Sequence, residues 1–348
     1  LPICIQFYDA RMTNYIGTVA LAFILFAGGL DTRWRDVRPV LAGGSLLATL
    51  GVVLTALFLF LPAYYVLRLE LPVALLLGVI VSSTDAPAVF MIMRTQKAEL
   101  RDNLRPLLEF ESAGNDPMAV LLSLGALAWL QNSDFAAAGL AKMFVLQLVV
   151  GFAAGCGLGW LAGVLLKKIC ICYFGLYTVF GVGFVLLTFG VAQLLGGSGF
   201  LAVYVAGIII GNRPFTYRRN LIRFHDSLAW IAQVGMFLLL GLLVNPRELP
   251  SVMPMGLLAA FFLIFFSRPA AVFICLWRSR FGWKEKLFVG WAGLKGAVPI
   301  ILATYPLMIG FPDSQYLFNL IFFLVIGSVL LQGKTLPWLA ARLDLYRK

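Results

Sequence analysis

Long apolar runs fill most of this 348-residue chain, and short polar segments separate them. A helix needs about 20 apolar residues to cross a bilayer. Eleven runs are that long or nearly so, and they cover residues 14–30, 40–67, 71–93, 107–130, 140–166, 174–195, 198–212, 228–244, 253–277, 286–309 and 314–331. The run 198–212 is short for a span. The polar segments 94–106 and 213–227 are expected to be loops or interfacial helices.

Composition agrees with this pattern. Hydrophobic residues make up 61% of the chain and charged residues 12%, and mean hydropathy is +0.94, which is far from the composition of a soluble domain. We therefore predict an all-α polytopic membrane protein in which residues 1–348 form a single transmembrane domain. The sequence begins at Leu1, and we expect further residues before it.

The basic residues divide unequally between alternate loops. If the eleven runs cross the bilayer in turn, loops on one side hold 21 Lys and Arg residues and loops on the other hold four. Basic loops stay on the cytoplasmic side, so we predict an external N-terminus, a cytoplasmic C-terminus and insertion in the plasma membrane. This distribution explains the net charge of +11 without a nucleic-acid partner.

Three carboxylates interrupt the apolar runs. Asp85 lies within 71–93, and Glu111 and Asp116 lie within 107–130. A charged side chain at the bilayer centre costs roughly 2.5–3.5 kcal/mol even on the scale derived from insertion experiments. Such residues usually face a cavity, a partner or a transported ion, so we expect the functional site at these carboxylates.

Parts of the chain recur at an offset of 212 residues. The matching pairs are Gly29 and Gly241, Gly78 and Gly290, and Pro87 and Pro299. The runs 71–93 and 286–309 are predicted to cross in opposite directions, so the halves form inverted repeats. A helix broken by Gly and Pro in each half is the typical sign of a transporter's binding site. Because proline lacks an N–H and disfavours helix before it, breaks are predicted at Pro87, Gly293, Gly296 and Pro299.

Helical spacing divides the acidic motif into two faces. Ser112 and Asp116 are four residues apart, as are Glu111 and Asn115, so the members of each pair are neighbours. We interpret the first pair as the ion-binding face and the second as structural support. Lys295 is a lone cation inside its run and needs an anionic partner, for which Glu111 is the candidate.

Oxygen ligands for Na⁺ or K⁺ are available in the same motifs. They are the Asp116 and Asp85 carboxylates, the Ser112 hydroxyl, and the Thr84 hydroxyl or carbonyl. Burial and a neighbouring negative charge both favour the protonated carboxyl group, so Asp116 is expected to hold a proton when no cation is bound. One carboxylate that binds either H⁺ or a cation suffices for exchange by alternating access, and no other cofactor is expected.

Three motifs together resemble a known family. They are Ser83-Thr84-Asp85, Glu111-Ser112-Ala113-Gly114-Asn115-Asp116 and Gly293-Leu294-Lys295-Gly296-Ala297-Val298-Pro299. The chain resembles the monovalent cation:proton antiporter-1 family over essentially its whole length. Within that family it is most similar to the bacterial NhaP-type and cell-volume-regulation potassium/proton antiporters.

This resemblance implies a fold and a role for each motif residue. The fold is the NhaA-like inverted repeat of thirteen helices with two crossing discontinuous helices, of which this chain would lack the first two. Residues 71–130 and 284–333 would form the ion-binding core, and 14–67 with parts of 140–277 the dimerisation scaffold of a homodimer. Asp116 would bind the ion and the proton, and the other ligands would be Thr84, Asp85 and Ser112.

The resemblance also bears on stoichiometry and on the supporting charges. Asn115 before Asp116 is associated with electroneutral exchange in the family. Glu111 would pair with the basic residue of the broken helix. That residue is usually arginine in the family and is Lys295 here, and lysine cannot form the two-pronged contact of a guanidinium.

Other functions are compatible with parts of the pattern. A sodium-coupled solute symporter with the same inverted-repeat fold is the main alternative. An intramembrane aspartyl protease would use Asp85 and Asp116, but Asp116 lies in Gly-Asn-Asp-Pro and not in the Gly-x-Gly-Asp such enzymes resemble. A channel fits poorly, because buried acids that hold protons are poor conduction sites. We predict a transporter and not an enzyme.

A stripe of glycines in the run 140–166 has a packing interpretation. Gly151, Gly155 and Gly159 are spaced four apart, which is typical of close helix packing in membranes. A dimer contact is the alternative use of this stripe.

Overall fold

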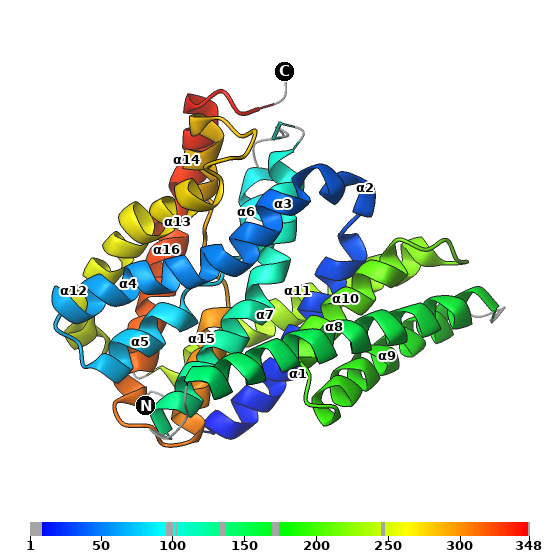
Figure 1. Ribbon diagram of the computed structural model, residues 1–348, viewed down its shortest axis with the longest axis horizontal. Coiled ribbons are helices and arrows are strands. Elements are labelled where there is room, and N and C mark those ends of the chain that lie inside the picture. The colour runs from blue at the N-terminus through cyan, green and yellow to red at the C-terminus, as the bar shows by residue number, and fades with distance from the viewer. Residues whose placement is uncertain are drawn as a thin grey trace, which may run out of the picture. The chain divides into compact units, whose positions relative to one another are not determined.

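The computed structural model describes residues 9–94, 100–101, 103–131, 137–168, 174–244 and 248–346. In these residues the regular structure is helical apart from one isolated bridge between Leu100 and Tyr346, as Figure 1 shows. The helices are α1 (Ala10–Asp31), α2 (Trp34–Val37), η1 (Arg38–Val40), α3 (Leu41–Leu46), η2 (Leu47–Gly51), α4 (Val52–Tyr65), α5 (Leu71–Ile80), α6 (Ala86–Arg94), α7 (Leu104–Gln131), α8 (Ala137–Lys168), α9 (Phe174–Leu194), α10 (Gly199–Gly211), α11 (Arg218–Leu243), α12 (Leu249–Phe262), η3 (Leu263–Ser267), α13 (Arg268–Cys275), α14 (Trp283–Trp291), α15 (Val298–Met308) and α16 (Ser314–Arg342). The predicted all-α architecture is confirmed.

The chain forms two compact units. Unit 1 contains Leu1–Asn14, Pro39–Gln131 and Leu239–Lys348, and unit 2 contains Tyr15–Arg38 and Asn132–Leu238. The functional assignment of 71–130 and 284–333 to an ion-binding core stays a prediction. All the predicted site residues belong to unit 1.

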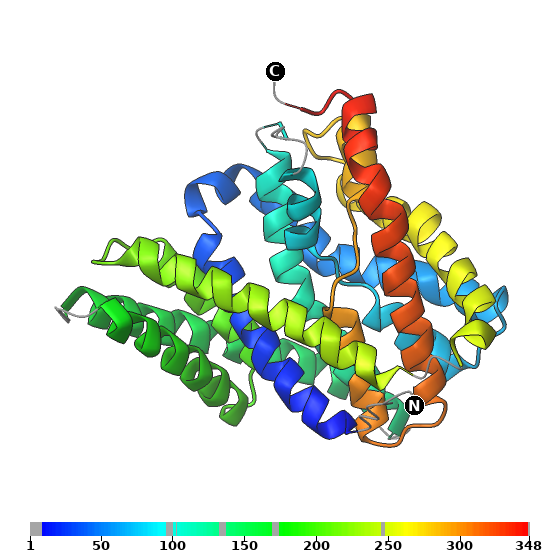
Figure 2. The same cartoon turned by 180° about the vertical axis from the view of Figure 1, so that it is seen from behind.

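Two helices of unit 1 are interrupted near their middles. Residues 81–85 between α5 and α6, and residues 292–297 between α14 and α15, leave the helical conformation. Pro87 and Pro299 lie in the first turns of α6 and α15, where a residue without an N–H is tolerated. Figure 2 shows the extended link after α14 running beside α16. The prolines therefore mark where each second half-helix begins.

The two interrupted helices have matching glycine contacts. A Cβ on Gly78 of α5 would lie 2.6 Å from the carbonyl oxygen of Ala56 in α4, and a Cβ on Gly290 of α14 would lie 3.2 Å from Cα of Pro269 in α13. The helices that these glycines contact also correspond to each other, because α4 follows the π-helical turn η2 and α13 follows the π-helical turn η3. This agreement supports the repeat for α5 and α14. In the predicted pair Gly29 and Gly241, a Cβ built on Gly241 has no atom within 4 Å. The repeat also predicts a polar turn after Gly241, at residues 245–247, which lie outside the described residues.

The apolar core of unit 1 packs against one half of each interrupted helix, namely α6 and α14. Buried side chains of α6, α7, α13, α14 and α16 form one cluster that includes Val89, Leu107, Val272, Phe288 and Leu336. Fully burying side chains of this size contributes about 1.5–3 kcal/mol each in water. Around the breaks this packing holds helix ends whose backbone groups have lost their helical partners.

In unit 2, α8 and α10 meet along the glycine stripe. A Cβ on Gly155 would lie 2.6 Å from the Ala202 carbonyl oxygen, and one on Gly159 would lie 2.8 Å from Cα of Ala206. Any side chain at these positions would force the two backbones apart. The prediction of close helix packing is confirmed, and the contact is made within the chain.

Seven described helical stretches are long and apolar enough to cross a membrane, by length and composition. They are Arg11–Asp31, Trp34–Tyr65, Lys142–Lys168, Gly175–Leu194, Arg218–Leu243, Leu249–Cys275 and Ser314–Arg342. Of the segment 213–227, the residues from Arg218 onward are helical, which is one of the two predicted forms, because α11 begins there and continues into the apolar run. Residues 218–243 contain no proline, so the helix is not interrupted after its basic first turns.

Candidate functional site

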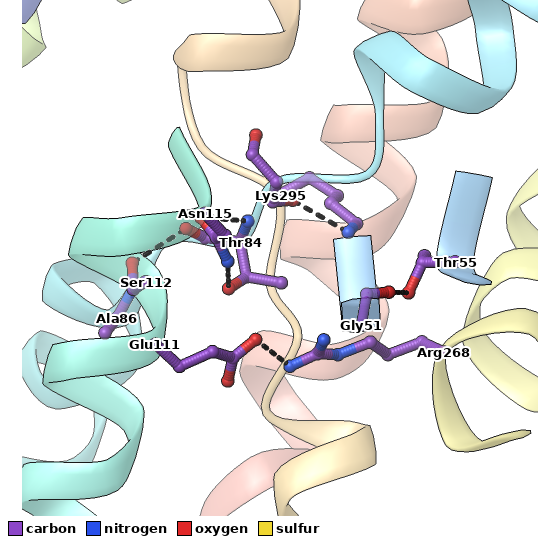
Figure 3. Close-up of polar contacts among 10 residues, drawn as sticks. Gly51, Thr55, Thr84, Ala86, Glu111, Ser112, Asn115, Arg268 and Lys295 are labelled. Carbon is purple, nitrogen blue, oxygen red and sulfur yellow. Dashed lines mark hydrogen bonds and ion pairs between the residues drawn. The ribbon is translucent and has the colours of Figure 1, made fainter. Parts of the chain in front are cut away.

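The first break is held in place by polar side chains of α7. Ser112 Oγ donates to the Thr84 carbonyl at 2.8 Å and accepts from the Ala86 amide at 2.9 Å. Asn115 Nδ2 donates to Thr84 Oγ1 at 2.6 Å, and Asn115 Oδ1 accepts from the Thr84 amide at 3.4 Å. Figure 3 shows both side chains directed at this segment. A break in lipid leaves backbone groups unpaired, and these two residues replace the missing partners.

Asp85 connects the two breaks. Its Oδ1 accepts from the Ala88 amide at 3.0 Å, which caps the N-terminus of α6 as an aspartate typically does. Its own amide donates to the Leu294 carbonyl at 2.8 Å in the second break. A Cβ built on Gly296 would collide with the Asp85 carboxylate. Gly296 therefore leaves the space in which this carboxylate approaches the second break.

Lys295 lies in the second break and is buried, with 1% of its surface exposed. Its Nζ donates to the Ser83 carbonyl at 2.8 Å, so it binds an unpaired oxygen of the first break. Its amide donates to Ser328 Oγ at 3.3 Å. Gln332 accepts from Ser328 and donates to the Trp291 carbonyl at 2.8 Å, at the end of α14. One lysine thus links both breaks and α16.

Glu111 forms a buried ion pair with Arg268, and Figure 3 shows the two side chains meeting. Their exposed fractions are 1% and 2%. The prediction that Glu111 pairs with Lys295 is therefore wrong. Arg268 follows the η3 turn and reaches Glu111, whereas Lys295 is directed to the Ser83 carbonyl.

Sequence reasoning assigned no role to Arg268, although the signal was present. It is the only charge in the run 253–277, and a lone intramembrane arginine needs an acidic partner. A Cβ on Gly293 would lie 2.9 Å from Arg268 Nε. Gly293 therefore gives the guanidinium room beside the second break. The buried charges in the described residues are then Arg268, Lys295, Glu111 and Asp116, and Asp85 beside them is half-buried.

Among the described residues, Asp116 has a buried carboxylate oxygen without a hydrogen-bond partner, and Ser83 of the first break has a buried hydroxyl without one. Asp116 is 8% exposed, and its unpaired atom is Oδ1. The Asp116 carboxyl group interacts electrostatically with the charges of Asp85, Lys295 and Glu111. Pro117 follows inside α7 and has no N–H, so the Ala113 carbonyl loses its helical donor. A carboxylate and a carbonyl with unused lone pairs thus occur one turn apart.

The arrangement combines most of the predicted site residues into one polar region. Ser112 and Asn115 both contact Thr84, and Asp85 and Lys295 connect the two breaks. Ser112 of the predicted binding face and Asn115 of the predicted supporting face both hold the first break, and the division into these two faces stays a prediction. Among the buried acidic oxygens that the structure describes, Asp116 Oδ1 has no hydrogen-bond partner. Hard monovalent cations bind such oxygen groups, and no group of three His, Cys, Asp or Glu suited to a metal occurs in the described part of the chain.

Comparison with known proteins identifies the family. The model for the transmembrane region of sodium/hydrogen exchangers matches residues 2–342. The chain is 40% identical over 344 residues to the K⁺/H⁺ antiporter NhaP of Alkalimonas amylolytica, covering 98% of this chain and 59% of that protein. It is 28% identical over 362 residues to the Na⁺/H⁺ antiporter ApNhaP of Aphanothece halophytica, covering 98% and 68%.

A solved structure has the same fold. The sodium proton antiporter MjNhaP1 of Methanocaldococcus jannaschii superimposes with a TM-score of 0.83 at 24% identity, over 96% of this chain and 86% of that one. This likeness confirms the predicted fold class with its interrupted helices. The chain spans about 59% of the length of the NhaP relative. By the family match over nearly its whole length, the chain belongs to the sodium/hydrogen exchanger transmembrane family.

Proposed function

We propose that this chain is the membrane-embedded part of a proton-coupled monovalent cation antiporter, in which Asp116 binds either a proton or the cation. The observation that carries the proposal is the buried Asp116 carboxylate with an unpaired oxygen beside two helix breaks. A charge in lipid that only stabilises the fold is expected to be paired. Glu111 is paired in that way, and Asp116 Oδ1 is not.

The charge balance supports competition between proton and cation. Arg268 neutralises Glu111, and the charge of Lys295 offsets one of the two remaining acids, Asp85 and Asp116, so one negative charge is left at the site. Asp116 then carries a charge that a bound proton or a bound monovalent cation neutralises equally. Alternating access of that neutral complex, in either form, moves one cation against one proton and is electroneutral.

The other oxygen ligands follow from the contacts at the first break. Thr84, Ser112 and Asp85 would supply the remaining ligands in their present or slightly shifted positions. Asn115, Glu111 and Lys295 would hold these groups in place. Movement of the breaks would change which side of the membrane reaches the site.

The names of the relatives favour K⁺ as the cation. The NhaP protein of Alkalimonas amylolytica and NhaP2 of Shewanella oneidensis, 40% and 39% identical to this chain, are both K⁺/H⁺ antiporters. The Na⁺/H⁺ antiporter ApNhaP is 28% identical. We therefore propose potassium/proton exchange across the plasma membrane by a homodimer, with the C-terminus in the cytoplasm.

The test is exchange in everted vesicles or proteoliposomes with Asp116→Asn. The amide cannot alternate between a charged and a protonated form, so exchange should fall at least about 100-fold. Asp36→Asn is the matched control, because Asp36 is exposed on α2. Near-normal exchange by a folded Asp116→Asn protein would refute the assignment.

Cation preference and coupling are measured in the same liposomes. K⁺, Na⁺ and Li⁺ are compared with and without a clamped voltage. Electroneutral exchange predicts rates that do not respond to voltage. Competition predicts that the apparent cation Kd rises as pH falls, by about tenfold per unit where the site is mostly protonated. Uptake of an organic solute with Na⁺ and without proton movement would instead support a symporter.

A further inference from the structure

A second polar site lies in unit 2, away from the residues used above. A cavity of about 290 Å³ is lined by the end of α1 and the first turns of α11. Four of its lining residues are arginines, namely Arg33, Arg218, Arg219 and Arg223, and one is acidic, Asp31. Whatever Asp31 pairs with, the cavity retains a net positive charge. We infer that this cavity binds a phosphate group at the membrane surface.

The walls of the cavity are fixed by hydrogen bonds. Asn212 Nδ2 donates to the Thr32 carbonyl at 2.8 Å, and Asn212 Oδ1 accepts from the Trp34 amide at 2.9 Å. These bonds attach the segment after α10 to the segment after α1. A Cβ on Gly207 would lie 2.6 Å from the Phe26 carbonyl oxygen, so α1 and α10 are in backbone contact. The ends of α1 and α10 beside the arginines are therefore held together by the protein itself before a ligand binds.

Arg218 is oriented before any ligand arrives. Its Nε donates to the Gly211 carbonyl at 2.7 Å, and its Nη2 donates to the same oxygen. A guanidinium has five N–H groups, so this contact uses two of them. Tyr217, just before it, has φ of +61°, and this sharp turn starts α11 beside the cavity. An oriented guanidinium suits the two-pronged contact that arginine makes with phosphate.

The helix that carries these arginines adds to the attraction. Arg218, Arg219, Ile222 and Arg223 occupy the first two turns of α11, which is 26 residues long. The N-terminus of a helix carries partial positive charge and favours anions. At the end of α1, the Gly28 and Gly29 carbonyls accept from the Thr32 amide, and the Thr32 carbonyl accepts from Asn212, so these oxygens already have donors.

The position of the cavity along the helices indicates where its ligand comes from. Asp31 ends one candidate span and Arg218 begins another, so the cavity lies at the level where a membrane span meets the polar headgroups. Leu30 and Ile222 contribute an apolar lining beside the arginines. Basic cavities between spans at this level bind anionic headgroups. The phosphate group would thus belong to an anionic lipid or to phosphate in solution.

Native mass spectrometry of the whole protein in detergent tests the inference and separates these sources. The probes are phosphatidylglycerol, phosphatidylcholine and inorganic phosphate, and the mass of the adduct identifies which one is bound. The variant is Arg219→Gln with Arg223→Gln, which leaves the Arg218 contact to Gly211 intact. The control is Arg35→Gln with Arg38→Gln, because both residues are exposed and neither lines the cavity.

We expect phosphatidylglycerol to bind the unaltered protein in preference to phosphatidylcholine. The Arg219/Arg223 variant should bind it about 30-fold more weakly, since each basic residue near a membrane contributes a factor of roughly five. The Arg35/Arg38 control should change by less than about twofold. The same pattern with inorganic phosphate supports the phosphate site with a soluble ligand. Equal binding by the Arg219/Arg223 variant and the unaltered protein, or an equal loss in the control, overturns the inference.

Discussion

The two units bring their helices together by different contacts. In unit 2, α8 and α10 meet through glycines, and the atoms that a Cβ on Gly155 would strike belong to backbone and to Val205. In unit 1, the α5–α6 and α14–α15 breaks meet through hydrogen bonds, and the atoms that a Cβ on Gly296 would strike belong to the Asp85 carboxylate. Unit 1 also has uncharged glycine packing at Gly78 and Gly290, but at its breaks glycine makes room for a charged group.

Unit 1 contains buried charges whose desolvation costs free energy, and helix packing alone does not explain why they are present. Close glycine contacts between helices contribute through van der Waals packing and need no charged group. Buried ion pairs are weak contributors to stability, because desolvation offsets their attraction. Unit 1 nevertheless holds Glu111, Arg268 and Lys295 at 2% exposure or less. Such charges are expected where ions are handled.

The largest expected effect separates activity from stability within unit 1. Asp116→Asn should abolish exchange as described above, and yet leave thermal stability within about 1 kcal/mol, because the unpaired Oδ1 loses no hydrogen bond. Circular dichroism melts and exchange are measured on the same preparations. Asp36→Asn is again the control. A strongly destabilised Asp116→Asn protein would mean that this carboxylate is structural, like Glu111.

The next effect concerns the buried ion pair. Glu111→Gln should cost about 3–5 kcal/mol, because it leaves the Arg268 guanidinium buried without its counter-charge. Unfolding by denaturant in detergent measures the loss. Arg268→Gln and the double variant complete a double-mutant cycle. The double variant should lose less than the sum of the single losses. Strict additivity would show that the pair does not interact.

A smaller effect is expected in the glycine contact of unit 2. Gly155→Ala should lower stability by up to about 3 kcal/mol, because its Cβ would lie 2.6 Å from the Ala202 carbonyl oxygen. Gly157→Ala is the matched control on the same helix, since a Cβ there has no atom within 4 Å. The protein that remains folded should keep its apparent cation Kd. An equal effect in both variants would attribute the loss to the helix backbone and not to packing.

The smallest effect is expected at the first break. Ser112→Ala removes the hydrogen bonds to the Thr84 carbonyl and the Ala86 amide, and should cost roughly 1–2 kcal/mol together with a weaker apparent cation affinity. Ser123→Ala is the control on the same helix, because Ser123 is buried and its hydroxyl has no hydrogen-bond partner among the described residues. Equal behaviour of the two variants would show that Ser112 does not hold the break.

The sequence predicted those features that depend on neighbouring residues in the chain, namely the helices and their interruptions. Apolar runs fixed where helices form, because a chain in lipid must pair its backbone groups within each segment. Pro87 and Pro299 indicated the interruptions, because a missing N–H acts at its own position in the chain. The sequence left open whether residues 213–227 form a loop or a helix, since basic residues in the first turns of a long helix have the same composition as a polar loop.

The pairing of charges was decided by the tertiary structure. From the sequence, Glu111 and Lys295 were a plausible pair, and Arg268 was equally a lone cation in an apolar run. Which cation reaches Glu111 depends on how α7, α13 and the second break approach one another in space. The sequence by itself determined which charges had to be buried and where the helices had to open. Only the packed helices decided that Glu111 meets Arg268, that Lys295 meets the Ser83 carbonyl and that an oxygen of Asp116 is left unpaired, because side-chain partners are set by distances between segments far apart in the chain.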